Sequence, residues 1–413
     1  NAVKRCPRAV VLWLMAAKEL WVRGDVPGAR SVLEEAFIAN PDSEDVWLAA
    51  FKLEFESRQP DRARMLLQKA REKATENGTA SSERVFVKAA IVEREVGDTN
   101  AERKILKEGL NAHTSARKLW LMLGQLELRV GDVNAARDAY VKGTRRCPLS
   151  VPLWLELANL ETTTGNHAKA RAVLEQARLR VTGGLGSANP NANSKENSEI
   201  ASTLWLASVR CERGDAFCFS APFFGDEIER VMNKNGGTSS GHFGDRSQNA
   251  NMFFDKDEAV KASEALMAKA LRECPDSGLL WAEQVRSASR PQRKSRSVDA
   301  LKRCGDDCNV VAAVARLFWI DRKLDKARTW FHRVCTLDPN NGDHWAVFYK
   351  FEGKNGTHEA AEAVLSRCVD AKPTKGEVWC AVRKDPKRWH NSIEQVLKKT
   401  AELVPGGEDR TAE

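Results

Sequence analysis

A proline followed six residues later by a tryptophan recurs along this chain, and several of these tryptophans lie 34 residues apart. The pairs are Pro7–Trp13, Pro41–Trp47, Pro148–Trp154, Pro275–Trp281, Pro339–Trp345 and Pro373–Trp379. A fixed period of this length is typical of helical hairpins that bury their apolar faces only by stacking. The sequence therefore predicts one elongated array, although 413 residues alone would suggest two or three globular domains.

Ten frames can be placed when the tryptophan is taken as position zero. They are centred on Trp13, Trp47, Phe86, Trp120, Trp154, Trp205, Trp281, Val311, Trp345 and Trp379. In each frame a helix A carries apolar residues at helical spacing, and a break such as Gly24-Asp25 separates it from a helix B. We expect the nine aromatic residues at position zero to pack in the joints between hairpins. A buried indole at Trp47 would make its loss cost about 3–5 kcal/mol.

Charged residues recur in the same frames. Glutamates stand seven residues after position zero and arginines seventeen after it: Glu54, Glu93, Glu127, Glu161, Glu212 and Glu352, with Arg30, Arg64, Arg103, Arg137, Arg171 and Arg328. The two side chains could meet at the hairpin turn or against a neighbouring hairpin, and bidentate pairing suits a guanidinium with a carboxylate. We interpret this recurrence as a structural ladder rather than a functional site.

Two interruptions and the chain end divide the array. The predicted segments are hairpin repeats over 1–182, a disordered insertion over 183–199, a repeat helix over 200–215, a mostly flexible insertion over 216–257, repeats over 258–385, and a capping helix with an acidic tail over 386–413. The first insertion is polar and rich in glycine, and the second carries the aromatic cluster FCFSAPFF. The start at Asn1, in mid-repeat, suggests a fragment of a longer array.

Sites of chemistry are not predicted. Cys304 and Cys308 are four residues apart, but no second pair or nearby histidine completes a four-ligand zinc set, and Cys211 with Cys218 gives none either. The scattered histidines stand in no catalytic motif, and the glycines near Gly183 lack a phosphate-loop lysine. We therefore expect no enzyme, catalytic residue, cofactor, metal or small-molecule substrate. The sparse cysteines indicate a reducing compartment, and the longest apolar run is too short to span a bilayer.

One basic run, SRPQRKSRSVDALKRC from Ser289 to Cys304, is the best candidate for binding. The candidate contact residues are Arg290, Arg293, Lys294 and Arg296. The run fits a solvated hairpin turn, and it also fits a contact with RNA phosphates or with an acidic protein segment.

The repeat itself resembles the half-a-TPR repeat, a variant of the tetratricopeptide repeat. Several stretches resemble the pre-mRNA-processing factor 6 family more specifically: the segment starting CPRAVVLWLM at Cys6, LMAKALRECPDSGLLW at Leu266, RPQRKSRSVDALKRC at Arg290 and KARTWFHRV at Lys326. The resemblance covers nearly the whole chain except the two insertions. It implies an all-α fold, a right-handed α-solenoid of half-a-TPR hairpins.

The same resemblance implies a nuclear, non-catalytic scaffold of the U5 snRNP. Such a scaffold bridges U5 to U4/U6 in the spliceosomal tri-snRNP, with tri-snRNP proteins as partners, any snRNA contact secondary, and no membrane. Two alternatives stay open: a half-a-TPR scaffold of another RNA-processing complex, and a solenoid that binds RNA directly. A peptide-clamping co-chaperone would need a basic cradle on adjacent A helices, and the sequence does not indicate one.

Overall fold

The computed structural model describes residues 6–76, 81–188, 194–213, 256–383, 391–404 and 406. These residues form twenty helices and no β-strand, apart from one isolated bridge between Asn341 and Lys375. The all-helical repeat fold predicted from the 34-residue period is confirmed. The chain divides into two compact units, Asn1–Cys147 and Pro148–Glu413, and each is described by itself. The right-handed sense of the array stays a prediction.

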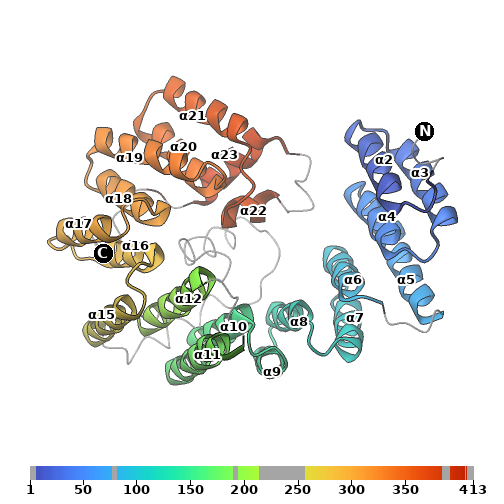
Figure 1. Cartoon of the computed structure of the whole chain (residues 1–413), viewed down its shortest axis with the longest axis horizontal. Coiled ribbons are helices and arrows are strands. Elements are labelled where there is room, and N and C mark those ends of the chain that lie inside the picture. The colour runs from blue at the N-terminus through green and yellow to red at the C-terminus, as the bar shows by residue number, and fades with distance from the viewer. Residues whose placement is uncertain are drawn as a thin grey trace. The chain divides into compact units, whose positions relative to one another are not determined.

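The first unit consists of four helical hairpins, drawn from blue to teal in Figure 1. The hairpins are α2 (Val10–Val22) with α3 (Val26–Ala39), α4 (Glu44–Glu56) with α5 (Pro60–Glu76), α6 (Glu83–Val96) with α7 (Thr99–Ala112), and α8 (Arg117–Val130) with α9 (Val133–Arg146). The B helix of one hairpin packs against the A helix of the next, as α5 does against α6. The apolar side chains therefore form a core both inside each hairpin and in the joint with the next one.

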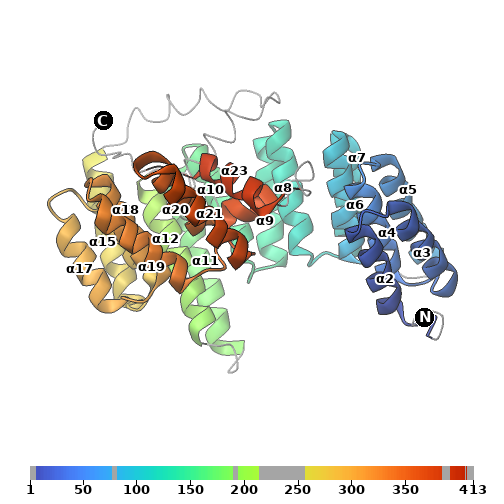
Figure 2. The same cartoon turned by 90° about the horizontal axis from the view of Figure 1, so that it is seen from above.

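The second unit continues the same pattern with six hairpins, whose helices Figure 2 shows from above. They are α10 (Val151–Thr163) with α11 (His167–Ala188), α12 (Ser194–Glu212) with α15 (Lys256–Glu273), α16 (Gly278–Ser287) with α17 (Arg293–Arg303), α18 (Cys308–Ile320) with α19 (Leu324–Leu337), α20 (Gly342–Asn355) with α21 (His358–Ala371), and α22 (Glu377–Arg383) with α23 (Ile393–Leu403). Each of the ten predicted frames corresponds to one hairpin.

In six frames the break between helices A and B uses a left-handed residue eleven positions after position zero. Glycine supplies this conformation in four frames, as at Gly97 with a φ of 89°. Arg58 and Arg322 adopt it without glycine. The aspartate that follows Gly97 caps helix B, because Asp98 Oδ1 accepts a hydrogen bond from the backbone N–H of Ala101 at 2.9 Å. The Gly-Asp pair thus ends one helix and starts the next.

The spacing of six residues between proline and tryptophan has a direct cause. The indole N–H donates a hydrogen bond to the carbonyl oxygen of the proline at 2.7–3.1 Å in five frames. Trp120 makes the same bond at 2.9 Å to Thr114, which stands where the other frames have proline. Each indole therefore closes the connection that enters its own hairpin.

The residues at position zero differ in burial. Phe86 and the tryptophans at 13, 154, 205, 345 and 379 are buried. Trp47, Trp120 and Trp281 are partly exposed, although each packs against a core cluster. Trp47 packs at its joint but is less buried than the sequence analysis expected. Its ring lies at the rim of the joint, 4.4 Å from the ring of Phe37 in the preceding hairpin, so its loss should cost less than the 3–5 kcal/mol expected for a core indole.

The recurring arginines and glutamates pair across the joints. An arginine early in helix B of one hairpin binds the glutamate late in helix A of the next: Arg30–Glu54, Arg64–Glu93, Arg103–Glu127, Arg171–Glu212 and Arg328–Glu352. In four of these pairs both Nε and Nη2 donate, one to each carboxylate oxygen. The sequence analysis left open whether the two side chains meet at their own hairpin turn or against a neighbouring hairpin. The structure shows that they meet against the neighbouring hairpin.

The expected insertions differ in part from the structure. Helix α11 continues to Ala188 and α12 begins at Ser194, so both flanks of the expected disordered segment 183–199 are helical. Extending an existing helix costs less free energy than nucleating a new one. Helix α11 therefore continues through the glycines near 183 instead of ending there. Residues 189–193 and 214–255, with the cluster FCFSAPFF, lie outside the described residues. Residues 384–390 also lie outside the described residues. The final helix α23 begins at Ile393, and Ser392 and Gln395 form a capping box at its start.

Candidate functional site

The basic run forms the corner between α16 and α17. Helix α16 ends at Ser287, and Ala288 takes an extended conformation with a ψ of 137°. Pro291 disfavours helical geometry at Arg290, so α17 begins only at Arg293. The corner follows from the local sequence and carries its basic residues on one short turn and one helix.

Arg293 is turned inward. Its side chain is buried, and its Nε donates a hydrogen bond to the carbonyl oxygen of Ala288 at 3.3 Å. This arginine holds the corner together and is not available as a partner contact, which corrects its place among the candidate residues. Arg290 and Lys294 are exposed and Arg296 is partly exposed. We call Arg290, Lys294, Arg296, Lys302 and Arg303 the α17 basic surface, since the last two are exposed as well.

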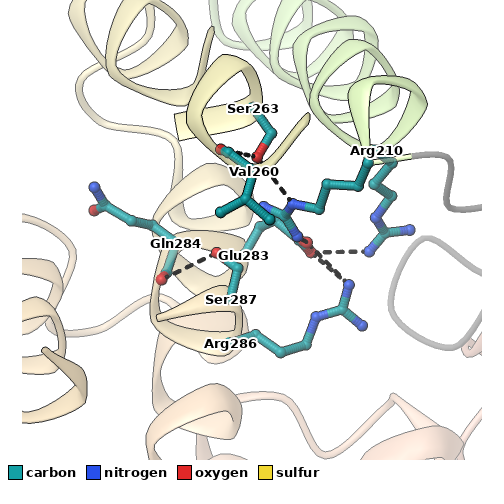
Figure 3. A network of polar contacts seen from close by, with 8 residues as sticks. Arg210, Val260, Ser263, Glu283, Gln284, Arg286 and Ser287 are labelled. Atoms are coloured by element: carbon teal, nitrogen blue, oxygen red, sulfur yellow. Dashed lines mark hydrogen bonds and ion pairs between the residues drawn. The ribbon is translucent and has the colours of Figure 1, made fainter. Parts of the chain in front are cut away.

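Three arginines surround one buried glutamate beside this corner (Figure 3). Glu283 on α16 is 3% exposed, and its carboxylate accepts hydrogen bonds from Arg210, Arg213 and Arg286 at 2.8–3.0 Å. Arg210 lies on α12 and Arg213 directly follows that helix, while Arg286 lies one turn along α16. The arrangement joins two hairpins through one carboxylate, which we call the Glu283 cluster.

Three arginines share the one carboxylate of Glu283. Burial by itself would raise the pKa of Glu283, but the positive charges of Arg286, Arg210 and Arg213 outweigh it and hold that pKa well below its usual range. The carboxylate is therefore ionised at any physiological pH. Arg286, with 40% of its side chain exposed, lies four residues before Arg290 in the chain. The α16 end of the cluster therefore adds positive charge beside the α17 basic surface.

Sequence reasoning missed the Glu283 cluster. Arg286 stands three residues after Glu283, a helical spacing that is visible in the sequence. Arg213 and Arg210 are 70 and 73 residues away, across the segment 214–255, and they fall outside the repeated glutamate and arginine positions. No periodic signal points to them.

A second group of cations lies in the first unit. Lys88 on α6 has a pKa lowered by burial and then by the charges of Lys52 on α4, Lys118 on α8 and the neighbouring Arg84. The A helices of three successive hairpins therefore bring positive charges together. The sequence analysis did not recognise this convergence, because only Arg84 and Lys118 share a frame position, while Lys52 and Lys88 stand at two others.

Two carboxylates meet in the joint between α20 and α22. Asp343 caps α22, since its oxygens accept hydrogen bonds from the backbone N–H groups of Glu377 at 2.6 Å and Trp379 at 2.8 Å. Burial raises the pKa of Asp343. Burial and then the charge of Asp343 raise the pKa of Glu377 to about 9. The helix cap formed by Asp343 therefore lies next to Glu377, whose carboxyl group favours its neutral form.

Replacing Glu377 by glutamine should stabilise the second unit at pH 8 and have little effect at pH 4. A carboxyl group with a raised folded-state pKa contributes stability that is fully present below its unfolded pKa of 4.5 and is lost as the pH rises towards 9. Glutamine removes that loss because it cannot ionise. Melting temperatures of both proteins between pH 4 and pH 9 would check this, and parallel curves for the two proteins would contradict it.

The cysteines of the described part are thiols rather than disulfides. Burial raises the pKa of Cys368 to about 12 and that of Cys335 further, so both thiols are poor nucleophiles. Cys218 of the predicted Cys211–Cys218 pair lies outside the described residues. Within the described residues, no helix combines the length and the apolar character needed to cross a membrane.

Comparisons with known proteins agree with the repeat architecture. A family model described as tetratricopeptide repeat matches residues 10–53 and 117–160. Human pre-mRNA-processing factor 6 is 52% identical over 113 residues, which are 27% of this chain and 12% of that protein. Pre-mRNA-splicing factor prp1 of Schizosaccharomyces pombe is 33% identical over 133 residues, 32% of this chain and 15% of that protein. The matched segments thus span well under a fifth of these relatives.

Among solved structures, the C-terminal part of a TPR repeat-containing protein from Cytophaga hutchinsonii covers 80% of this chain and 97% of its own, at 12% identity and a TM-score of 0.38. A likeness at this level carries no argument about function.

Proposed function

We propose that this chain, which belongs to the pre-mRNA-processing factor 6 family, acts in pre-mRNA splicing as a non-catalytic scaffold. In this proposal its hairpins bind proteins of the U5 snRNP and of the U4/U6 snRNP in the nucleus, and they hold the two particles together in the tri-snRNP. The observation that carries it is the identity of 52% over 113 residues to a human relative whose name states a role in pre-mRNA processing.

The architecture of the hairpins is compatible with this role. Stacked hairpins use their apolar residues in the joints and leave the outer faces of both helices available over a long surface. The α17 basic surface offers exposed cations on such a face, and complementary charge guides and orients an acidic protein segment. Ion pairs between a buried glutamate and a partly exposed arginine at the joints keep neighbouring hairpins in register. A scaffold needs such fixed spacing between its contact surfaces.

Direct RNA binding is the competing function, because the α17 basic surface would also suit phosphates. A sequence-tolerant RNA binder stacks bases on exposed aromatic rings next to its cations. In the described residues Trp281 of α16 packs against the core cluster that includes Ala300 of α17, and Trp319 of α18 is buried in the next cluster along the chain. A formal charge of +8 over 413 residues also gives only a modest field. These observations favour protein partners.

The test is to recover partners of the full chain from nuclear extract, with and without nuclease. We expect U5 and U4/U6 proteins to be recovered, and a substantial part to remain after nuclease, because protein contacts hold them. Recovery of a polyadenylation or ribosome-biogenesis complex instead would assign the chain to another RNA-processing scaffold. Complete loss of partners after nuclease, with tight and steeply salt-dependent binding of naked RNA, would establish direct RNA recognition.

Reversing charges of the α17 basic surface tests whether this surface binds a partner protein. Arg290, Lys294 and Arg296 are changed together to glutamate, while the buried Arg293 is kept so that the corner stays intact. The matched control reverses Lys104, Lys107 and Lys142, three exposed lysines of α7 and α9. We expect the first variant to lose one partner and the control to lose none. Equal weakening of all partners by both variants would mean that only net charge matters.

A further inference from the structure

Three potential metal ligands of different kinds meet at the ends of three consecutive helices in the second unit. Cys308 is the first residue of α18, Asp338 directly follows α19, and His344 is the third residue of α20. One sulfur, one carboxylate oxygen and one ring nitrogen lie within 4.8 Å of one another, and all three residues are partly buried. Successive members of this group are 30 and 6 residues apart, a spacing that does not indicate a metal site in the sequence.

The His344 side chain has a ring nitrogen that could bind a ligand at this position. Its Nε2 is buried and has no hydrogen-bond partner in the described part of the chain. A buried imidazole nitrogen without a partner is costly, since protein interiors pair nearly all such groups. Burial also lowers the pKa of His344 to about 4, although the charge of Asp338 acts in the opposite direction. The Nε2 atom is therefore a donor that no other group in the described residues occupies.

The other two side chains complete a coherent donor set. Burial raises the pKa of Cys308 to about 11, so without a cation its thiol keeps its proton. A divalent cation displaces that proton, and the N-terminus of α18 stabilises the resulting thiolate. No hydrogen bond joins any two of these three side chains among the described residues. Each therefore has a donor atom available to a shared ion.

We propose that Cys308, Asp338 and His344 bind a Zn²⁺ ion, with water as the fourth ligand. Thiolate, imidazole and carboxylate are the three ligand types that zinc prefers, whereas Mg²⁺ and Ca²⁺ favour sites made of oxygen alone. A zinc ion here ties the start of α18, the end of α19 and the start of α20 to one another. It stabilises the folded joint increasingly as the free Zn²⁺ concentration rises above the dissociation constant, and it leaves one coordination position for a water molecule or for a side chain of a partner.

Cobalt provides a direct test, because Co²⁺ takes tetrahedral zinc sites and reports its ligands by absorption. The full chain is treated with a chelator, freed of it, and titrated with Co²⁺ alone. We expect one equivalent to bind with the intense visible bands of a tetrahedral centre and a thiolate-to-cobalt charge-transfer band, and Zn²⁺ to displace it. No spectral change at micromolar Co²⁺, or bands of an octahedral centre without thiolate, would overturn the proposal.

Two ligand variants and one control test the sulfur and nitrogen ligands. Cys308→Ser should abolish the charge-transfer band, and His344→Ala should weaken Co²⁺ binding by at least about tenfold. Cys304→Ser is the matched control, a partly buried thiol four residues away that should change neither. Circular dichroism at the titration temperature verifies that each variant is folded. A charge-transfer band that survives Cys308→Ser, or disappears with Cys304→Ser, would refute this ligand set.

The melting temperature distinguishes a zinc ion bound at Cys308 from zinc bound elsewhere on the chain. Zn²⁺ should raise the melting temperature of the chelator-treated chain and leave that of Cys308→Ser unchanged. If Zn²⁺ shifts both proteins equally, it binds elsewhere and the proposal fails. The outcome is independent of the splicing role, because no splicing partner enters either measurement.

Discussion

Replacing Glu283 by glutamine should lower the free energy of unfolding of the second unit by about 3–5 kcal/mol, because it leaves buried arginines without their anion. Arg210 and Arg213 expose only 5% and 19% of their side chains, so water cannot replace the carboxylate. Glutamine keeps the size of the side chain, and the loss therefore reports the charge. Urea unfolding, combined with hydrogen exchange of the amides in α12 and α16, measures it.

The control for Glu283 is an exposed pair of the same kind. Glu19 binds Arg23 at 2.7 Å, but the two side chains are 64% and 69% exposed. Glu19→Gln should therefore cost no more than about 0.5 kcal/mol. A loss below about 1 kcal/mol for Glu283→Gln would show that the arginines find other partners, and it would refute the assignment of the cluster as a joint between α12 and α16.

The same variant should behave differently in acid. The folded-state pKa of Glu283 lies below its unfolded value of 4.5, so its ionised form contributes stability above that pH and loses it as the pH falls further. The difference between the two proteins should accordingly be full at pH 7 and shrink below about pH 4.5. A difference that persists unchanged at pH 3 would indicate a packing defect instead.

Replacing Trp379 by alanine is the second change with a large expected effect, about 3–5 kcal/mol in the stability of the C-terminal hairpins. The indole is 0% exposed, and its N–H donates to the carbonyl oxygen of Pro373 at 3.1 Å. Gly342 lies so close that an added Cβ would come 2.0 Å from the indole ring. Helix α22 has only seven residues, so little else anchors it.

Trp47→Ala is the matched comparison, since Trp47 holds the same frame position but is partly exposed. It should cost roughly half as much, because less apolar area returns to water. Hydrogen exchange should show faster exchange in α22 and α23 for Trp379→Ala, and in α3 and α4 for Trp47→Ala. Equal losses for both tryptophans would mean that frame position, rather than burial, sets the contribution.

The hairpins could be predicted because their determinants are local and repeated. The six-residue distance from proline to tryptophan reflects one hydrogen bond inside one connection, as between Trp345 and Pro339 at 2.8 Å. The Gly-Asp breaks combine a left-handed helix end with a helix cap, as at Gly131 and Asp132. Such features act within a few residues of the chain, and repetition makes them visible above the variation at other positions.

The ladder of ion pairs was only half predictable. Recurrence of Arg30 and Glu54 at matching positions indicated a structural pair, but period alone places the two residues equally well within a hairpin or between hairpins. The hydrogen bonds of 2.6 and 2.9 Å between them run from one hairpin to the next. That choice depends on how far the second hairpin rotates over the first, which is a property of packing.

Other features were decided by tertiary structure alone. Arg293 looked like its exposed neighbour Lys294 in sequence, and only the turn at Ala288 draws its side chain inward. Glu283 collects arginines from 70 and 73 residues away. Cys308 meets His344 because the ends of α18, α19 and α20 converge. Local periodicity specifies where each helix runs and marks the recurring ion pairs, whereas these three groups depend on contacts that no repeat unit encodes, because each occurs only once in the chain.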